Sequence, residues 1–304
     1  MTLEADTSEP DGIETSPGAP TPVALPWSTQ FDLASKISGR TYRIFVFAPP
    51  LPPREPAGYP LLVALDGNMT FPIAAAMGSM YAFSGTPAVV VGVGYPASPL
   101  EIQMLRFRDL TPPTPAEGVP KRPGIPPLGP EHYGGSGDFR RFLTEELRPA
   151  IAAAHKIDPA REALFGYSLG GLFVLDTLFN QPDAYGRYMA ASPSIWWNDS
   201  AVLADEAGFV RAIDGGAPAP RVLISVGDRE QMAPSRLPAG MSLDDAEALV
   251  AEGRMVDNAW ELSTRLGRIT GCGYASCFHA FENEDHLTCL AASVGRALDF
   301  ATRD

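Results

Sequence analysis

The stretch LFGYSLGGLF at residues 164–173 decides the fold of this chain. An apolar run leads into its Gly-x-Ser-x-Gly core and a helix-like run follows, which is the strand–turn–helix context of a nucleophile elbow. A serine hydroxyl is a weak nucleophile, so a sharp, exposed turn must present it to a base. Gly166 and Gly170 leave room for chain that passes close to Ser168. The alternative is a glycine-rich turn in which Ser168 only caps a helix.

Two backbone N–H groups are expected to form an oxyanion site beside this serine. A helix that starts at Ser168 leaves its first N–H groups without intrahelical partners, so the N–H of Leu169 can bind a developing oxyanion. The second donor is expected in a turn after a buried apolar run nearer the N-terminus, as the N–H of Asn68 or alternatively of Gly67. Asp66 in that turn is interpreted as a brace of the local backbone.

Strand and helix patterns alternate along the chain. Apolar runs of strand length predict strands at residues 40–48, 61–65, 88–93, 163–165, 188–192, 221–226 and 277–281. Helical patterns are found at residues 73–80, 137–153, 168–179, 242–266 and 287–302. The alternation predicts an α/β fold with a mostly parallel sheet and helices on both faces. Because ligands bind at the carboxyl ends of such strands, one edge should gather Gly67, Ser168, Trp197, Glu230 and His286.

Composition limits the classes of protein that this chain can represent. With 304 residues, 45% of them hydrophobic, a single α/β domain is expected over residues 23–304. A net charge of −13 argues against nucleic acid as a partner, and no apolar run reaches the roughly 18 residues of a membrane span. The chain has no metal-binding motif, so neither metal nor cofactor is expected. Cys272 and Cys277 are close enough in sequence to pair, although reduced thiols are favoured.

Two stretches lack a helical or strand pattern. Residues 1–22 are acidic and rich in Pro, Ser, Thr and Gly, which predicts a disordered or loosely attached tail. They lack the basic start and apolar centre of a signal peptide, so a cytoplasmic location is expected. Residues 96–135 show no sustained period and contain eight prolines between positions 111 and 130. A loop of this length is usually functional, and it is expected to cover the site; a tolerated surface insertion is the alternative.

A serine in such an elbow needs an acid and a histidine later in the chain. Of the four histidines, His132 and His155 precede Ser168, and His279 falls inside a predicted strand. His286 lies in a loop just before the final helix, where the base of such a site belongs. The sequence therefore predicts His286 as the base, with a capping or surface histidine as the alternative.

The acid is expected directly after the penultimate predicted strand. Glu230 is preferred there, with Asp228 as the alternative acid. Asp285 is adjacent to His286, and neighbouring side chains in an extended loop point apart. With these groups, His286 would take the proton of Ser168 as the serine attacks an ester carbonyl, and water would later release the acyl group.

With these residues assigned, the chain resembles the putative-esterase (esterase D-like) group of α/β-hydrolases, and more narrowly the siderophore trilactone esterases. The resemblance extends over about residues 42–300. It rests on the segments LDGN at 65–68, RDLTP at 108–112, GG at 134–135, FL at 142–143, EL at 146–147, GYSLGGLF at 166–173, SPSIWW at 192–197 and EDH at 284–286. It implies an α/β-hydrolase fold with Ser168 as nucleophile and His286 as base, and a lactone of the enterobactin, salmochelin or bacillibactin type as substrate. The acid varies among such relatives, some of which are closer to a Ser–His dyad.

Arg108 and Trp197 are the candidate substrate contacts. Arg108 belongs to a group of basic residues that could receive a trianionic ferric catecholate, namely Arg106, Arg108, Lys121 and Arg122. Its alternative is an ion pair with Asp109 or another loop carboxylate. Trp196 and Trp197 could stack on catechol rings, but adjacent residues in an extended segment face opposite ways, so one of them should be core.

Three other functions use the same scaffold. A general carboxylesterase for acyl, thioester or carbohydrate esters differs only in substrate, and an acyltransferase differs only in the acceptor that outcompetes water. A non-catalytic binding protein would be expected to have lost Ser168 or His286, and both are present. The expected partner is therefore a small-molecule ester, and no oligomeric state is predicted.

Overall fold

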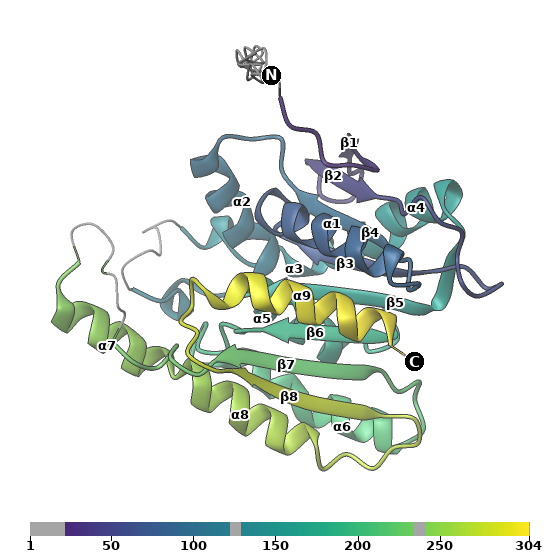
Figure 1. Ribbon diagram of the computed structural model, residues 1–304. Helices are drawn as coiled ribbons and strands as arrows, with labels where there is room; N and C mark the ends of the chain where they lie inside the picture. The colour runs from purple at the N-terminus through teal and green to yellow at the C-terminus, as the bar shows by residue number, and fades with distance from the viewer. Residues whose placement is uncertain (1–21, 122–128, 234–236, 238–240, 304) are drawn as a thin grey trace, which may run out of the picture.

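An eight-stranded sheet forms the centre of the computed structural model, which describes residues 22–121, 129–233, 237 and 241–303 (Figure 1). In sheet order the strands are β1 (Ser28–Ala34), β2 (Thr41–Phe47), β4 (Val89–Gly94), β3 (Tyr59–Leu65), β5 (Ile157–Tyr167), β6 (Arg187–Ala191), β7 (Arg221–Gly227) and β8 (Ala275–Phe281). β2 pairs antiparallel with both β1 and β4, and all other neighbours pair parallel. The predicted mostly parallel sheet is confirmed.

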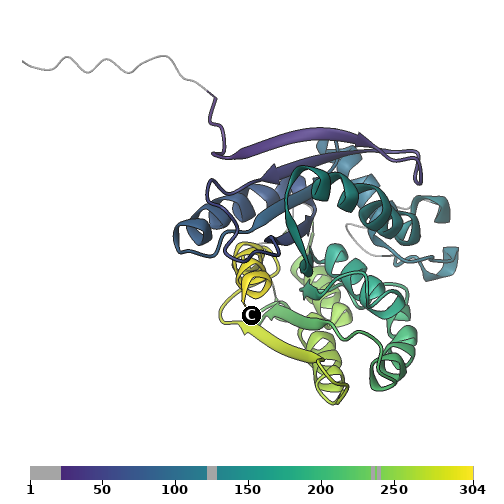
Figure 2. The ribbon, with the colours of Figure 1, turned by 90° about the vertical axis from the view of Figure 1, so that its right-hand side faces the viewer.

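Helices cover both faces of this sheet, as Figure 2 shows. One face is covered by α1 (Gly67–Phe83) and α9 (Cys289–Thr302), which contact each other. The other face carries α2 (Pro99–Leu110), α3 (Ser136–Arg141), α4 (Arg148–Ala154), α5 (Leu169–Asn180), α6 (Glu206–Asp214) and α8 (Met255–Leu266). Successive strand side chains alternate between two cores: Leu164 packs with the α5 side, and Ala163 and Phe165 pack with the α1–α9 side.

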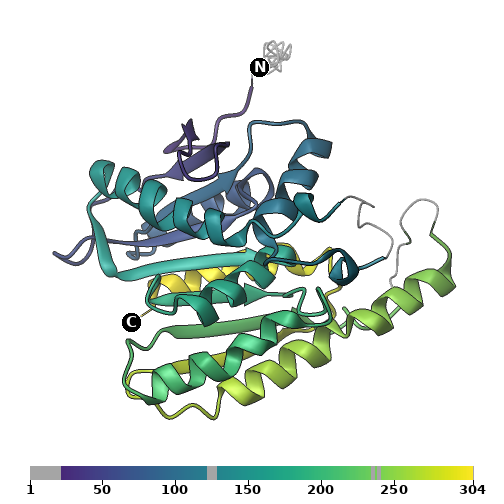
Figure 3. The ribbon, with the colours of Figure 1, turned by 180° about the vertical axis from the view of Figure 1, so that it is seen from behind.

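The carboxyl ends of the parallel strands meet at one edge of the sheet. Two further features lie there: α2, and α7 (Leu243–Gly253), which projects past the sheet in Figures 1 and 3. The strand register aligns Tyr167 with Ala191 and Ala191 with Ser225, so the turns that follow β5, β6 and β7 lie side by side. This edge therefore gathers residues that are far apart in sequence.

The structure adds elements that the sequence pattern did not predict. β1 is an edge strand with mostly exposed side chains, so it has no apolar run. α2 lies in the segment that was expected to be loop. This helix buries only Phe107, Asp109 and Leu110, so its sequence shows no sustained apolar period that would have predicted it. The single helix predicted over 242–266 is two helices, since Arg254 adopts a left-handed φ of 41° between α7 and α8.

The remaining elements are short. The helix predicted over 137–153 consists of α3, the π-helical η3 (Phe142–Leu147) and α4 in succession. The described part of the chain also has three 3-10 turns: η1 (Ala116–Gly118), η2 (Pro130–His132) and η4 (Ala201–Asp205). All three cysteines are free thiols. Within the described ranges, no helix combines the length and the apolar character needed to cross a bilayer. The tail predicted at 1–22 lies, apart from residue 22, outside the described residues.

Candidate active site

Ser168 lies in the tight turn between β5 and α5 that the sequence predicted. Its backbone has φ 60° and ψ −116°, a region that residues other than glycine adopt only under strain. A Cβ atom on Gly166 would lie 2.1 Å from the carbonyl oxygen of Gly170, so only glycine fits there. The Ser168 N–H donates to Ala191 O (3.0 Å), and Ser168 O accepts from Ser194 N–H (3.1 Å). These bonds to the β6 turn hold the strained residue in place.

A continuous hydrogen-bonded chain joins Ser168, His286 and Glu230. Ser168 Oγ is 3.1 Å from His286 Nε2, and His286 Nδ1 is 2.6 Å from Glu230 Oε2. The Glu230 side chain is fully buried, whereas that of His286 is 47% exposed. The structure thus brings together the nucleophile, base and preferred acid that the sequence proposed, in the spatial order that proton transfer to the histidine requires.

The alternative acid, Asp228, lies elsewhere. It is exposed, and its Oδ1 accepts a hydrogen bond from the N–H of Asn283 at 2.8 Å. The turn after β7 closes through a bond from Glu230 N–H to Gly227 O, which directs the Glu230 side chain inward. Geometry therefore favours Glu230 over Asp228 as the partner of His286.

Residues that sequence reasoning did not single out support this chain. Ser192 Oγ donates to Glu230 Oε1 at 2.5 Å, and Gly227 N–H donates to the same oxygen at 2.7 Å, which leaves Oε2 for His286. The Tyr167 ring packs on the His286 ring with centroids 5.1 Å apart, and its hydroxyl donates to His286 O at 2.6 Å. Burial raises the pKa of Tyr167 far above its ordinary value, so this hydroxyl keeps its proton. Both residues directly follow or end a strand, which is the signal that could have identified them.

The predicted oxyanion donors line two different hollows. Leu169 is the first residue of α5 and lines the same cavity as Ser168. Gly67 and Asn68 begin α1 and line a neighbouring hollow beside β1. The Asn68 side chain exchanges two hydrogen bonds with the backbone of Tyr95, at 2.8 and 3.1 Å, which fixes this turn to the end of β4. The second donor therefore stays a prediction.

Asp66 does not have the role that the sequence predicted. Its side chain does not brace the local turn but forms a two-point ion pair with Arg106 of α2, with Nε–Oδ1 at 2.5 Å and Nη2–Oδ2 at 2.9 Å. The Asp66 side chain is 3% exposed and that of Arg106 is 12% exposed. Asp66 itself has a left-handed φ of 56° at the start of α1. The pair ties α2 to the turn after β3, across 40 residues of sequence.

The chain of Ser168, His286 and Glu230 opens into a cavity of about 430 Å³. Its polar lining adds Ser194, whose hydroxyl oxygen is 3.4 Å from that of Ser168. The rest of the wall comes from α2 (Gln103, Arg106, Phe107), from Trp196, and from α7 and the start of α8 (Leu249, Val250, Gly253, Met255). The cavity is therefore mostly apolar.

The two predicted substrate contacts do not line this cavity. Trp197 is 1% exposed and packs against Phe107 and Tyr133, with its Nε1–H donating to Thr114 Oγ1 at 2.9 Å. Trp196 is half-buried and lines the cavity, so one tryptophan is core, as the alternation required, and the other faces the site. Arg108 donates to the carbonyl oxygen of Tyr133. It anchors α2 to the following loop, and Asp109 pairs with Arg40 instead.

The expected cover is also only partly in place. Of residues 96–135, α2 supplies one wall of the cavity, and residues 117–121 line a groove of about 580 Å³ that shares Trp196 with it. The opposite wall is α7, a helix that the sequence predicted without indicating its position. Of the proposed basic group, Arg106 is paired with Asp66, Lys121 lies in the adjoining groove, and Arg122 falls outside the described residues.

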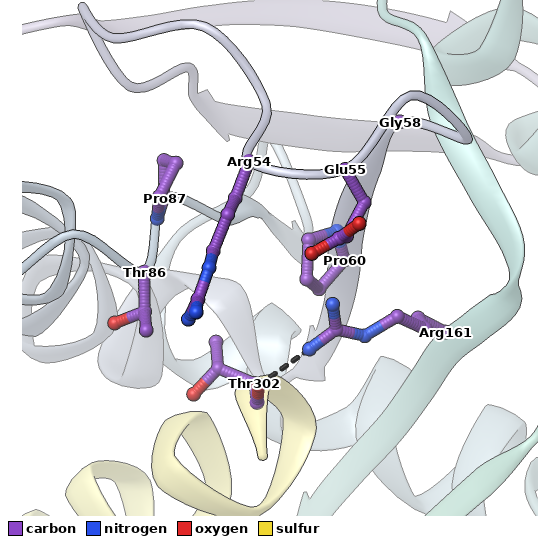
Figure 4. A pocket seen from close by; sticks show the side chains of 8 residues that line it. All are labelled: Arg54, Glu55, Gly58, Pro60, Thr86, Pro87, Arg161 and Thr302. Carbon is purple, nitrogen blue, oxygen red and sulfur yellow. Dashed lines mark hydrogen bonds between the residues drawn. The ribbon is translucent and has the colours of Figure 1, made fainter. Parts of the chain in front are cut away.

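A second hollow lies at the opposite, amino-terminal edge of the strands, and Figure 4 shows its lining side chains. Arg161 donates to the carbonyl oxygen of Thr302 at the end of α9, and Arg54 and Glu55 flank it. The accessible volume of this hollow is only about 20 Å³, which is little more than a single water molecule needs. This hollow is therefore too small for a substrate, in contrast to the cavity at Ser168.

Known proteins share both the sequence and this architecture. The family described as Putative esterase matches residues 126–252. Ferri-bacillibactin esterase BesA of Bacillus subtilis is 36% identical over 295 residues, which cover 94% of this chain and 93% of that protein. The chain belongs to the putative esterase family. A second family relative, the siderophore triacetylfusarinine C esterase of Aspergillus fumigatus, is 35% identical over 302 residues, or 94% of this chain and 96% of the relative.

Solved structures share this fold. The BES protein from Bacillus cereus superposes with a TM-score of 0.78 at 30% identity, covering 94% of this chain and 99% of that one. The predicted α/β-hydrolase fold and the resemblance to siderophore esterases are confirmed. The protein is a serine hydrolase that acts on ester bonds, and this replaces the alternative of a non-catalytic binding protein.

Proposed function

We propose that this esterase hydrolyses the ester bonds of a siderophore, with Ser168 as nucleophile, His286 as general base and Glu230 as the acid that orients the histidine. One observation carries the proposal: the hydrogen-bonded chain of these three residues opens into a mostly apolar cavity of about 430 Å³. The names of the two relatives that align over nearly the whole chain support a siderophore as the substrate.

The proposed reaction proceeds through an acyl-enzyme. His286 Nε2 takes the proton of Ser168 Oγ as that oxygen attacks the ester carbonyl, and the Leu169 N–H stabilises the oxyanion. His286 then protonates the leaving alcohol. Water, activated by the same nitrogen, releases the acid and regenerates the hydroxyl of Ser168. Glu230 stabilises the imidazolium that forms in both steps. Hydrogen bonds from the Ser192 hydroxyl and the Gly227 N–H hold the carboxylate of Glu230 in position.

The size of the site supports a bulky ester. Trp196 lines both the cavity at Ser168 and the groove of about 580 Å³, so a substrate that extends beyond the scissile bond has further surface to contact next to this ring. A short acyl chain would leave most of the wall formed by α2 and α7 without a contact. Aromatic and apolar walls of this kind contribute binding energy to large substrates.

The test is a substrate panel followed by mass spectrometry. The protein is incubated with a tricatechol trilactone and with a trihydroxamate triester, each iron-free and iron-loaded, and the linear products are quantified. A short-chain nitrophenyl ester and the Ser168→Ala variant run alongside. Serine-dependent opening of a siderophore ester, faster than nitrophenyl turnover, is expected. Robust nitrophenyl turnover without siderophore opening would reject the substrate and keep the mechanism.

A further inference from the structure

We infer that the Ser168 site selects siderophore esters without net charge over trianionic ferric catecholates. The inference rests on the proposed function and narrows its substrate class. A ferric trihydroxamate ester is uncharged, because three hydroxamate anions balance Fe³⁺, and an iron-free tricatechol lactone is uncharged at neutral pH. A ferric tricatecholate carries three negative charges. The residues around the cavity distinguish between these ligands.

The cation in the cavity wall is already neutralised. Arg106 holds two hydrogen bonds to the carboxylate of Asp66, and the two side chains are 12% and 3% exposed. Its Nη1 also donates to Gln103 Oε1 at 3.0 Å, so the guanidinium faces protein groups on several sides. Arg108, on the same helix, donates to the Tyr133 carbonyl and does not line the cavity. A trianion entering the cavity would therefore meet no uncompensated arginine from α2.

The helix and the loop that flank the site are acidic. The wall helix α7 has the sequence LDDAEALVAEG, with four carboxylates and no Lys or Arg. The loop that leads to His286 contributes three more. The seven carboxylates on this helix and this loop, which supply Leu249, Val250 and His286 to the cavity wall, are called the rim here: Asp244, Asp245, Glu247, Glu252, Glu282, Glu284 and Asp285. Figure 1 places α7 at the carboxyl-terminal edge, where β7 and β8 also end. Acidic residues in the first turn of α7 also favour its helix dipole, but Glu252 at its last turn does not, so the dipole explains only part of this charge.

The cations near the rim are outnumbered and mostly paired. Arg254 donates to Glu261 at 2.7 Å and lies 3.5 Å from Asp257. Arg229 donates to Asn283 Oδ1. Lys121 shares the adjoining groove with three carboxylates, those of Glu117, Asp199 and Glu252. The field at the entrance is therefore negative, in line with the net charge of −13.

The rim charges and the apolar lining both disfavour binding of a trianionic ligand. Phe107, Trp196, Leu249, Val250 and Met255 form a surface that solvates an uncharged ligand body well and a charged one poorly. At about 10 Å and physiological salt, screened repulsion between a trianion and several excess carboxylates amounts to about a tenfold loss in kcat/KM. This loss affects the ferric catecholate and spares the uncharged esters.

The experiment compares kcat/KM for ferric triacetylfusarinine C, iron-free tricatechol trilactone and ferric tricatechol trilactone, at low and at high salt. Both uncharged esters are expected to exceed the ferric catecholate by about tenfold at physiological salt. Added salt should raise turnover of the trianion and leave the uncharged esters nearly unchanged. The two uncharged substrates, compared with each other, tell whether the site prefers hydroxamate or catechol chemistry.

Charge variants make the test specific. Glu247→Gln combined with Glu282→Gln removes two exposed rim charges that line neither the cavity nor the groove, and it should raise kcat/KM for the ferric catecholate alone. Glu55→Gln, at the opposite edge of the sheet in Figure 4, is the matched control and should change none of the three. A ferric catecholate that reacts as fast as the uncharged esters, or slows with salt, would overturn the selectivity alone. Failure of every siderophore ester, with nitrophenyl turnover intact, would overturn the proposed function and the selectivity together.

Discussion

Two buried carboxylates each bind a nitrogen-bearing side chain that lines the cavity. Glu230 binds Nδ1 of His286 at 2.6 Å, and Asp66 binds Nε of Arg106 at 2.5 Å. Their side chains are 0% and 3% exposed. Histidine releases and accepts a proton near neutral pH, whereas arginine stays charged throughout. The same pairing therefore serves proton transfer on the Glu230 side and a fixed architecture on the Asp66 side.

The hydrogen-bond partners of the two carboxylates also fit this division between proton transfer and fixed architecture. One oxygen of Glu230 is held by Ser192 and Gly227, and the other is left for a partner that changes its charge during turnover. Both oxygens of Asp66 are taken by one guanidinium. Changes on the Glu230 side should therefore alter the rate of the chemical step, and changes on the Asp66 side should alter folding and substrate binding.

The largest effect is expected from the nucleophile between the two pairs. Ser168→Ala removes the attacking oxygen and should lower kcat by on the order of 10³-fold or more. Folding should be retained, because the side chain makes only the bond to His286 and a long contact to Ser194. Steady-state hydrolysis of a nitrophenyl ester, together with a thermal melt, measures both quantities. Activity within tenfold of the parent would remove Ser168 from the mechanism.

The second-largest effect on kcat is expected at the acid, Glu230. Glu230→Gln keeps the shape of the side chain but loses its charge, so it should lower kcat by on the order of 10²-fold. Asp228→Asn, two residues away and exposed, is the matched control and should stay within about twofold. The pH profile of kcat is recorded for both variants. A larger loss in Asp228→Asn than in Glu230→Gln would reverse the assignment of the acid.

On the other side, Asp66→Asn should act mainly through stability. The amide retains the left-handed backbone that Asp66 adopts but leaves Arg106 buried without its counter-charge, which costs roughly 3–5 kcal/mol. Disordering of α2 should also lower kcat/KM by about tenfold. Urea unfolding measures the first effect and ester kinetics the second. The double variant with Arg106→Leu should regain part of the stability, and a single variant as stable as the parent would show that the pair is not structural.

The two adjacent tryptophans should separate binding from folding. Trp196→Ala should raise KM for a bulky ester several-fold with little change in stability, because its ring lines the cavity. Trp197→Ala should leave a void in the core and lower the free energy of unfolding by about 3–5 kcal/mol. Kinetics and urea unfolding of both variants give the comparison. A rise in KM without destabilisation in Trp197→Ala would restore it as a substrate contact.

The smallest effect on turnover is expected at Asp109, a third buried carboxylate. Burial raises the pKa of Asp109 from 3.8 to about 6, against the opposing influence of Arg40 and the hydroxyls of Tyr42 and Tyr95. The folded state thus holds a proton that the unfolded chain has released. This contribution, on the order of 3 kcal/mol, is complete below pH 3.8 and is lost as the pH rises through about 6. Unfolding between pH 4 and 7 should show this slope, and Asp109→Asn should flatten it with kcat unchanged.

The sequence predicted the Glu230 side of the site better than the Asp66 side. Ser168, Glu230 and His286 each follow a strand, and parallel strands end at one edge, so chain order and strand ends were enough to bring them together. The pair of Asp66 and Arg106 joins a turn to a helix 40 residues later, and no periodic pattern encodes such a contact. The same applies to the placement of α7 beside the cavity.

Some errors had readable signals. α2 was missed because it buries only three residues, yet Ser98 and Glu101 form a capping box around Pro99, which is a known start signal for a helix. The alternation of Trp196 and Trp197 was predicted, but which of them faces the cavity depends on the turn after β6, where Ser192 adopts a φ of 43°. Three consecutive residues with positive φ, Asn198, Asp199 and Ser200, bend the chain further after the two tryptophans.

The strained backbone of Ser168, with its positive φ, lowers thermal stability, whereas the hydroxyl that it presents is required for turnover. A residue with a Cβ atom held in that conformation raises the free energy of the folded state by roughly 1–3 kcal/mol, and glycine would relieve it. Selection for a higher melting temperature alone would therefore favour the loss of the hydroxyl on which turnover depends. Thermostable descendants of this enzyme must gain their stability elsewhere, in the two cores or in the ion pairs, and leave the elbow as it is.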